Sequence, residues 1–393
     1  MTALLPGATL GIIGGGQLAR MMILEARTMG YRTCVLSPSH DDPAVSVADE
    51  WVVGALDDAR AAARLARCSD VVTMDTEHVP ADVLRRIEDQ VLVRPSPSVF
   101  ETVQDRRAQR AFLDRVGIPQ PRCVPIRSIE SLREEAAALG FSAVLKSSHA
   151  GYDGRGQAVI RGSQDLASAW EKVGRRPAVL EEWVDFDFEI SVLLARNPAG
   201  EVRFYPLALN AHRHQVLRTT MAPAPVGRGV ETEVREIAER IAGALDHVGM
   251  MAVEMFVVDG SSILVNEIAP RPHNSGHFTF GACVTSQFEQ HVRGVLGLPL
   301  GDTLLPQGAA MVNLFGDLWR EGEPDWTGIL STPEARLHLY GKQDPRPGRK
   351  MGHVLIVHRD PFEALRTGEA LLEELHGGPS VERAPRNGLS CAN

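Results

Sequence analysis

The sequence has little that would place the protein in a membrane or outside the cell. The longest unbroken apolar runs among its 393 residues are only a few residues long, far short of the roughly 18 that a membrane-spanning helix needs. The first segment, MTALLPGATLGIIGGG, lacks a basic region and is interrupted by Pro6 and Gly7, which is not typical of a secretory signal. The five cysteines are odd in number and include no C-x-x-C pair, so reduced thiols are expected rather than disulfides or a zinc site. We therefore expect a cytoplasmic protein with no membrane partner.

Positive charge is also scarce. The chain has 41 Lys and Arg against 50 Asp and Glu, a formal charge of -9, whereas a general nucleic-acid binder needs clustered basic residues. We therefore expect no nucleic-acid partner. The Walker A pattern G-x-x-x-x-G-K-[ST] does not occur, and no Ser/His/Asp or Cys/His arrangement indicates covalent catalysis. What is present is a globular composition, 44% apolar and 23% charged, in a chain long enough for two to three domains of about 150 residues.

The first part of the chain alternates strand-like and helix-like segments, which predicts βαβ units around a parallel sheet, an α/β domain. The expected strands are 9–14, 32–37, 51–53, 70–74 and 91–96, and the expected helices are 17–29, 57–67 and 80–88. Ser98-Val-Phe-Glu101 has the pattern of a capping box and predicts one long helix that Gly117 ends. That helix is a sensible domain boundary.

From about residue 118 to 300 the pattern changes to strands joined by hairpins, which predicts an α+β domain. The expected strands are 141–148, 157–162, 178–184, 189–196, 202–210, 250–258 and 262–269, with helices near 128–139 and 232–247. A smaller unit follows, with strands 337–342 and 352–358 and an amphipathic helix near 361–375. The predicted domains are 1–105, 106–302 with a mobile glycine-rich loop at 149–157, and a β-rich 303–393.

A glycine-rich turn opens the chain. The run from Gly14 to Ala19, with Gln17 and Leu18 inside it, fits G-x-G-x-x-A between a strand and a helix, where backbone N–H groups at the helix N-terminus can face an anion. A nicotinamide dinucleotide would need an acidic residue at the end of the second strand, but that strand ends Leu36-Ser37-Pro38. Another anionic ligand and a merely tight turn remain open.

A hairpin near residue 260 brings two carboxylates together. A turn at Gly260-Ser261, or a four-residue loop around it, pairs Val258 with Ile263 and places Glu254 directly opposite Glu267. A turn one residue earlier moves the two glutamates to a diagonal but leaves them on one face.

Two like charges so close should repel each other, so a cation between Glu254 and Glu267 is expected. All-oxygen ligands suit Mg²⁺, which often binds through one or two carboxylates plus substrate phosphates. Asn266 points to the other face of a regular strand and would need a bulge to help. The alternative is an exposed hairpin face with two solvated glutamates.

A second hairpin carries the loop His149–Gln157, HAGYDGRGQ, after a strand that ends near Lys146. Three glycines in six residues, with Arg155 among them, give a loop whose amides can wrap phosphate oxygens. Lys146 could reach the same phosphates. An ordinary flexible hairpin is the alternative.

The remaining candidates lie near the end of the Glu267 strand and in the last third of the chain. Arg271 and His273 follow that strand and could hold a small anion beside a metal, whereas zinc binding by His273 and His277 lacks a third soft ligand. Glu77 follows the fourth strand, where open α/β sheets usually bind ligands. A basic cluster in an acidic chain predicts a phosphate site or a solvated loop, and it consists of Lys342, Arg346, Arg349 and Lys350.

Together these motifs resemble the ATP-grasp ligases, and more narrowly the 5-(carboxyamino)imidazole ribonucleotide synthases of purine biosynthesis. The resemblance runs in order over nearly the whole chain, through GIIGGGQLARMM, DVVTMDTEHVP, GYDGRGQ, LEEWVDFDFEIS, FYPLALNAH, NEIAPRPHNSGH and RPGRKMGHV. It implies a biotin-carboxylase-like N-terminal domain, an ATP-grasp core and a small C-terminal domain. It also implies a homodimer.

The resemblance implies ATP-dependent carboxylation of 5-aminoimidazole ribonucleotide with bicarbonate, through carboxyphosphate, with Mg²⁺ or Mn²⁺. The ribonucleotide's amine would capture the activated carbon or the CO₂ that it releases. A formate-using ribonucleotide formyltransferase with the same core is the nearest alternative. A nicotinamide oxidoreductase and a non-catalytic nucleotide-binding regulator are the others.

By matching position, the resemblance also implies roles for individual residues. Glu254 and Glu267 match metal ligands. The implied catalytic residues are Lys146, Asp153, Arg271, His273 and Asn274. The implied ATP contacts are Arg106, Lys146, Gly151, Tyr152, Asp153, Gly154, Arg155, Gly156, Gln157, the hinge Glu181, Glu182, Trp183 and Val184, and Glu189, His212, Asn266 and Glu267. The implied ribonucleotide contacts are Gln17, Leu18, Glu77, Tyr152, Asp153, Arg155, Lys342, Arg349 and Lys350.

Overall fold

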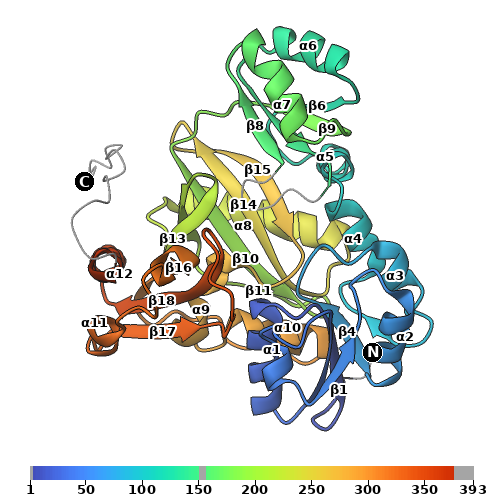
Figure 1. Cartoon of the computed structure of the whole chain (residues 1–393), viewed down its shortest axis with the longest axis vertical. Coiled ribbons are helices and arrows are strands. Elements are labelled where there is room, and N and C mark those ends of the chain that lie inside the picture. Colours follow the sequence, from blue (N-terminus) through green and yellow to red (C-terminus); the bar gives the residue numbers. More distant parts are fainter. Residues whose placement is uncertain (1–2, 150–155, 376–393) are drawn as a thin grey trace.

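The structure is a computed structural model that describes residues 3–149 and 156–375. Within these residues the strands form three sheets, of five, four and nine strands, with helices packed against them (Figure 1). The predicted loop residues Gly151, Tyr152, Asp153, Gly154 and Arg155 lie outside the described residues. In the described part of the chain, no helix is both long and apolar enough to cross a membrane.

The first sheet is parallel, with the strand order β3-β2-β1-β4-β5. Its strands are β1 Thr9–Ile13, β2 Arg32–Ser37, β3 Glu50–Val53, β4 Val71–Met74 and β5 Leu92–Val93. The connecting helices are α1 Gln17–Thr28, α2 Ala59–Arg67 and α3 Ala81–Arg85, with a short 3-10 turn at Val45–Val47. Leu10, Ile12 and Ile13 of β1 are fully buried, as expected of a parallel strand covered on both faces. The α/β domain predicted from the alternating pattern is confirmed.

The single long helix predicted from Ser98 to Gly117 is wrong. The chain forms α4 Pro97–Val103 and α5 Arg106–Arg115 instead. Asp105 separates them with extended backbone angles (φ -109°, ψ 116°), and its carboxylate accepts a hydrogen bond from the Arg107 N–H. Ser98 lies inside α4, where its hydroxyl is 2.9 Å from that of Ser96. The real N-cap is therefore Asp105, because its side chain satisfies the free N–H groups of a new helix.

The second sheet is antiparallel, with the order β6-β9-β7-β8, and forms the lobe at the top of Figure 1. Its strands are β6 Cys123–Ile126, β7 Ala143–Ser147, β8 Gln157–Ile160 and β9 Ala178–Glu182, covered by α6 Ile129–Ala138 and α7 Leu166–Lys172. Leu132, Leu145, Ile160 and Leu180 belong to its core. This lobe carries Lys146 on β7 and Glu181 on β9.

The third sheet joins the middle and the end of the chain in the order β15-β14-β10-β12-β13-β16-β18-β17, with β11 paired to β10. Its strands are β10 Phe188–Arg196, β11 Val202–Phe204, β12 Ala208–Arg213, β13 Val216–Ala222, β14 Gly249–Val258, β15 Ser262–Ala269, β16 Gly308–Phe315, β17 Ala335–Leu339 and β18 Lys350–His358. The accompanying helices are α8 Arg228–Ala244, α9 Thr279–Ala282, α10 Gln287–Leu296, α11 Thr327–Leu330 and α12 Pro361–Leu375.

The antiparallel pairing of β13 with β16 carries this sheet across the predicted boundary at residue 303. The last third of the chain is therefore built onto the sheet of the middle third. The division into 1–105, 106–302 and 303–393 stays a prediction.

The hairpin of β14 and β15 has a different register from the expected one. Val258 pairs with Ser262 rather than Ile263. The turn is centred on Asp259 and Gly260, which both have positive φ, and the Ser261 N–H donates to Val258 O at 3.1 Å. Continued without interruption, this register would place Glu254 opposite Asn266 and put Glu267 on the other face of the sheet.

A β-bulge next to Glu254 corrects the slip. Beyond it Glu254 pairs directly with Glu267. The bulge leaves Asn266 as the extra residue of β15, since Met255 pairs with Val265 and Glu254 with Glu267. Bulges of this kind re-aim side chains, and this one aligns Glu254 with Glu267 on neighbouring strands.

Helix α10 connects the first and third sheets. Its residues Phe288 and Val292 share a core with Met22 of α1, and Figure 1 shows the two helices side by side. Arg94 Nη1 donates to Val295 O at 2.6 Å in a buried contact. The N-terminal sheet is thus fixed against the sheet that carries Glu254 and Glu267.

The N-terminus of α1 faces a carboxylate of the protein itself. The N–H of Gly16, which was expected to face an anionic ligand, donates to Asp75 Oδ2 at 2.8 Å. Gly14 has φ +115°, and a Cβ at this position would overlap the Asp75 carboxylate. The glycines therefore allow Asp75 to approach the helix end closely.

We expect Gly14→Ala to lower the free energy of unfolding by about 2–4 kcal/mol, because it combines a left-handed backbone with overpacking. Gly7→Ala is the matched control. Gly7 also has positive φ, +98°, but no atom of the described residues lies within 4 Å of the place that a Cβ would take there, so only the backbone cost of about 1 kcal/mol applies. Urea denaturation followed by circular dichroism measures both, and equal losses would contradict the close approach of Asp75.

Candidate active site

A buried ion network lies where the second sheet meets α5 and β15. Glu181 is 2% exposed. Its Oε2 lies 2.5 Å from Lys146 Nζ, and its Oε1 accepts hydrogen bonds from Arg110 Nη2 at 2.7 Å and Arg110 Nε at 2.9 Å. Burial alone would raise the pKa of Glu181, but the charges of Lys146, Arg110 and Arg106 lower it to about 2. Glu181 is therefore ionised at neutral pH and orients two cations.

The bulge residue Asn266 belongs to the same network. Lys146 Nζ lies 3.3 Å from Asn266 Oδ1, and Arg110 Nη2 donates to the Asn266 carbonyl at 2.8 Å. Arg106 Nη2 lies 3.1 Å from Glu267 Oε2. The structure thus brings together the predicted Arg106, Lys146, Asn266 and Glu267.

Several carboxylates lie close together on the neighbouring strands. Atoms of Glu189, His212 and Glu254 lie within 4.8 Å of one another. Burial, and then the charges of Glu254 and Glu267, raise the pKa of Glu189 well above its usual value. Its buried Oε1 lies 3.4 Å from His212 Nδ1 and forms no hydrogen bond with the described residues. Mg²⁺ and Mn²⁺ prefer carboxylate oxygens as ligands. A carboxylate oxygen without a hydrogen bond, next to further carboxylates, therefore fits the metal that the sequence predicts.

The opposite end of the site contains Arg271 and His273. Arg271 Nη2 lies 2.7 Å from Glu77 Oε2, and its Nη1 donates to Pro272 O at 2.9 Å. Glu77 follows β4 of the first sheet and Arg271 follows β15 of the third, so this ion pair crosses between sheets. His273 Nε2 lies 3.6 Å from Glu254 Oε1, which connects this end to the carboxylates.

His273 is a neutral imidazole. Burial, and then the charges of Arg271 and Lys350, lower its pKa well below the usual value. Its Nδ1 accepts a hydrogen bond from the Ser275 N–H at 3.4 Å, so the ring hydrogen sits on Nε2, facing Glu254. The ring is therefore set up as a hydrogen-bond donor at Nε2.

Asn274 makes a reciprocal amide pair with Asn313 of β16. Asn274 Nδ2 donates to Asn313 Oδ1 at 3.1 Å, and Asn313 Nδ2 donates to Asn274 Oδ1 at 2.8 Å. Both ends of the Asn274 amide are thus used within the protein, and the pair links the Arg271 loop to the last third of the chain. Its predicted role toward bicarbonate stays a prediction.

The predicted hinge residues lie at the end of β9. The N–H groups of Glu182 and Trp183 already donate to Arg122 O and Ser142 O, each at 2.9 Å, and the Trp183 side chain is 44% exposed. If this segment binds adenine, the hydrogen bonds would have to come from the carbonyls of Glu182 and Trp183 or from the backbone of Val184. Glu181, predicted with them, points instead at Lys146.

The remaining predicted residues are dispersed around the network. Gly156 O accepts from the Ser147 N–H at 2.7 Å, and Gln157 pairs with Lys146 across β7 and β8. Leu18 is 7% exposed and packs in the core under α1, so it could meet a ligand only through its backbone. Gln17, the first residue of α1, is half-buried.

The basic cluster is held mainly by its own loop. Lys342 Nζ donates to Lys350 O at 2.6 Å, and Arg349 Nη1 donates to Asp344 O at 2.8 Å. Arg346 pairs with Asp344 at 2.7 Å. The charge of Lys350 still acts on His273, which places this loop close to the Arg271 end of the site.

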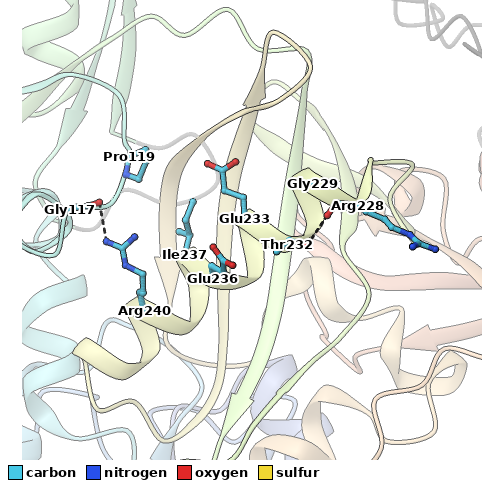
Figure 2. A pocket seen from close by; sticks show the side chains of 9 residues that line it. All are labelled: Gly117, Pro119, Arg228, Gly229, Thr232, Glu233, Glu236, Ile237 and Arg240. Carbon is cyan, nitrogen blue, oxygen red and sulfur yellow. Dashed lines mark hydrogen bonds between the residues drawn. The ribbon is translucent and has the colours of Figure 1, made fainter.

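A surface hollow of about 670 Å³ lies elsewhere, between α8 and the segment after α5 (Figure 2). Figure 2 shows Arg240 reaching toward the Gly117 carbonyl, to which its Nη2 donates at 3.2 Å. None of the predicted site residues that the structure describes lines this hollow. The chemistry is thus concentrated in the ion network rather than in this open depression.

Family models match three successive parts of the chain. They are the ribonucleotide synthetase preATP-grasp domain over residues 7–104, the ATP-grasp domain over 111–288 and the phosphoribosylaminoimidazole carboxylase C-terminal domain over 309–367. The N5-carboxyaminoimidazole ribonucleotide synthase of Brucella melitensis biotype 1 is 42% identical over 358 residues, which are 91% of this chain and 98% of that protein. The chain belongs to the N5-carboxyaminoimidazole ribonucleotide synthase family.

Other members of this family are similar to the chain over most of its length. The synthase of Bacillus subtilis is 38% identical and covers 91% of this chain, with 93% of its own length matched. A crystal structure of the ADP complex of an N5-carboxyaminoimidazole ribonucleotide synthetase has a TM-score of 0.90 at 38% identity, covering 96% of this chain and 99% of that one. The Aspergillus clavatus synthase in complex with ADP and 5-aminoimidazole ribonucleotide has a TM-score of 0.86 at 30% identity, covering 94% and 99%. The predicted family, the fold and the assignment to the ATP-grasp ligases are confirmed.

Sequence reasoning missed two residues that organise this family's site in the present chain. Arg110 is 4% exposed and binds both Glu181 and the β15 backbone. Arg110 lies one helical turn after Arg106 on α5, and the i, i+4 spacing of the two arginines could have identified Arg110 from the sequence. Asn313 pairs with Asn274 from a strand 39 residues away, and no local pattern indicates that contact.

We expect the stability of the protein to depend on Asp75 between about pH 4 and 6. Burial raises the pKa of Asp75 from 3.8 to about 6, although Gly16 and Arg271 act in the other direction. A folded-state pKa above the unfolded one means that the folded state holds the proton more tightly. The free energy of unfolding therefore falls as the pH rises through this window, by about 3 kcal/mol for a two-unit shift.

Asp75→Asn removes this dependence while keeping an oxygen for the Gly16 N–H. In urea denaturation, the free energy of unfolding of the variant minus that of the wild-type protein should increase from pH 4 to pH 7. Asp58→Asn is the control, because hydrogen bonds from Ala61 and Arg60 lower the pKa of Asp58 below 3.8, so its effect stays constant above about pH 5. A pH-independent difference for Asp75→Asn would contradict the assignment.

Proposed function

We propose that the chain carboxylates 5-aminoimidazole ribonucleotide to 5-(carboxyamino)imidazole ribonucleotide, using bicarbonate and ATP and releasing ADP and phosphate. The proposal rests chiefly on one arrangement, the Lys146–Glu181 pair directly beside the Glu254–Glu267 hairpin. A buried cation that can bind phosphate lies there next to carboxylates that can bind a metal, which is what phosphoryl transfer requires. Membership in the synthase family supports the choice of substrate.

The first step activates bicarbonate. An oxygen of bicarbonate attacks the γ-phosphorus of ATP, the bond from that phosphorus to the leaving oxygen of ADP breaks, and carboxyphosphate forms. Lys146 and Arg106 offset the charge on the transferred phosphoryl group, because their side chains are only 12% and 14% exposed, lie beside the carboxylates and are held by ion pairs. Bicarbonate needs this step because it is a poor electrophile without a leaving group.

The second step forms the carbon–nitrogen bond. The exocyclic amine of the ribonucleotide attacks the carboxyl carbon of carboxyphosphate, or the CO₂ that it releases, while phosphate leaves with the electrons of the broken C–O bond and the amine loses a proton. Arg271, oriented by Glu77, is proposed to hold the bicarbonate-derived group. His273 and Asp153 are the proposed candidates for the proton acceptor; the lone pair that a neutral His273 offers is on Nδ1, the ring nitrogen that accepts from the Ser275 N–H.

Mg²⁺ or Mn²⁺ is the proposed metal, and Glu254 and Glu267 are its proposed ligands. Glu189 and His212 lie close enough to complete the set, since their donor atoms and those of Glu254 lie within 4.8 Å of each other. When bound, the metal would neutralise charge on the ATP phosphates.

The contacts carried over from the family are proposals as well. The loop 149–157, the hinge Glu181–Val184 and Glu189 are proposed to bind ATP. Gln17, Glu77, Lys342 and the Arg349-Lys350 pair are proposed to surround the ribonucleotide. A homodimer and a cytoplasmic location are further proposals, which rest on the family resemblance and on composition.

The reaction is tested by phosphate release from Mg·ATP. We expect strong stimulation only when 5-aminoimidazole ribonucleotide and bicarbonate are both present, because carboxyphosphate is consumed productively only when the amine is available. Incorporation of ¹⁴C from bicarbonate into the ribonucleotide checks the product. Formate in place of bicarbonate should give no stimulation, and stimulation by formate would favour the formyltransferase alternative.

We expect Glu267→Gln to lower kcat by about 10²-fold or more, because it replaces a proposed metal-ligand carboxylate with a neutral amide. The protein should remain folded, since the Glu267 side chain is 41% exposed. Glu231→Gln is the control, because Glu231 forms an i,i+4 pair with Arg235 along helix α8, away from the proposed site residues. Retained activity in Glu267→Gln, measured by the same phosphate release, would break the metal assignment.

A further inference from the structure

Gln287, the first residue of α10, is fully buried and holds the backbone of His273 with both ends of its amide. Its Oε1 accepts from the His273 N–H at 2.9 Å, and its Nε2 donates to the His273 carbonyl at 2.8 Å. Nε2 also lies 3.1 Å from His277 Nδ1. One side chain therefore satisfies three polar groups of the loop that follows β15.

The rest of the loop closes around the same helix end. The Gln287 N–H donates to Thr279 Oγ1 at 2.9 Å, and the Thr279 hydroxyl donates to Gly276 O at 2.7 Å. A Cβ at Gly276 would overlap the Gln287 amide. The contact is thus close and specific rather than a loose packing of side chains.

We propose that Gln287 is a positioning residue for the carboxylation described above, on which this inference rests. By fixing both the N–H and the carbonyl of His273, Gln287 sets the direction in which the imidazole leaves the backbone. That direction places Nε2 3.6 Å from Glu254 Oε1. Gln287 needs no contact with the substrate, since it acts through His273.

His291, one turn further along α10, ties the helix to the two strands that flank the site. The Met250 N–H, at the start of the Glu254 strand, donates to His291 Nδ1 at 3.0 Å. The ring hydrogen is therefore on Nε2, which lies 2.8 Å from Thr73 Oγ1 in β4. β4 leads to Glu77, the partner of Arg271. Helix α10 consequently fixes the position of the His273 loop relative to both strands.

The chain supplies a matched control on the same helix. Gln290 is also fully buried. Its Nε2 donates to the Gly301 carbonyl at 2.9 Å, and its Oε1 accepts from the Gly301 N–H at 2.7 Å. Gln290 thus binds the N–H and the carbonyl of one backbone residue, as Gln287 does, but no proposed site residue lies in that segment. Loss of either side chain therefore removes two buried hydrogen bonds to backbone.

The test compares Gln287→Leu with Gln290→Leu in the full-length chain. Both variants lose two buried hydrogen bonds to backbone, and Gln287→Leu also loses the 3.1 Å contact with His277 Nδ1, so its drop in melting temperature should be at least as large as that of Gln290→Leu. Only Gln287→Leu should lower kcat for ribonucleotide-dependent phosphate release, by about 10- to 100-fold, because misplacement of a reacting group by about 1 Å costs up to about 10²-fold. The KM for ATP should change less than about 3-fold, since the ATP network is not touched.

Equal kcat values for the two leucine variants would overturn the proposal, because the effect would then be one of stability alone. A wild-type chain without ribonucleotide-dependent turnover would overturn the proposed function, and this inference with it. The two failures are distinguishable, since the first is seen only against an active wild-type enzyme.

Gln287→Glu covers the case in which the leucine variant does not fold. The new carboxyl keeps an oxygen for the His273 N–H, but when ionised it cannot donate to the His273 carbonyl. When protonated it can, so the ratio of its kcat to that of the wild type should rise as the pH falls from 8 to 6. A pH-independent ratio near 1 would overturn the role of the donated hydrogen bond.

Discussion

The site depends on one buried carboxylate, Glu181. It is almost completely removed from water, and it is stable there only because Lys146 and Arg110 contact its two oxygens. These partners come from different elements, β7 and α5, while Arg110 also binds the carbonyls of β15. Removal of one member of such a network leaves an uncompensated buried charge, which typically costs about 3–5 kcal/mol. The ion network therefore joins the small lobe to the hairpin that carries the carboxylates.

The same site contains more negative charge than its own cations neutralise locally. Glu189, Glu254 and Glu267 face one another across three neighbouring strands, and burial raises the pKa of Glu189 well above its usual value. A divalent cation would relieve this repulsion, and the phosphates of ATP would be attracted to the cations on the other side. At the far end Arg271 and neutral His273 provide a less acidic region. The polarity of the site thus changes along its length, as the proposed phosphoryl and carboxyl transfers would require.

Local patterns predicted much of the fold and of the candidate site. Alternating strands and helices were enough for the parallel sheet, since each βαβ unit is encoded within about 30 residues. The pairing of Glu254 with Glu267 followed from hairpin geometry, yet the turn was wrong by one residue and the β-bulge restored the pairing. The capping-box pattern at Ser98 failed because Asp105, seven residues later, caps a new helix. Competing local signals of this kind cannot be ranked without the packing that selects one of them.

The sequence by itself determined the family, the order of the domains and the kinds of side chain available for phosphate and metal. Its glycine motifs, paired glutamates and Lys146 are local features, and their spacing survives in any compatible fold. Only the tertiary structure decided that Glu181 points at Lys146 rather than toward the hinge, that Asp75 occupies the N-terminus of α1, and that Asn313 completes the Asn274 pair. It also assigned Gln287 to the backbone of His273. These contacts join segments that are distant in the chain or meet only across sheets. They depend on burial and directed hydrogen bonds, which no short stretch of sequence specifies.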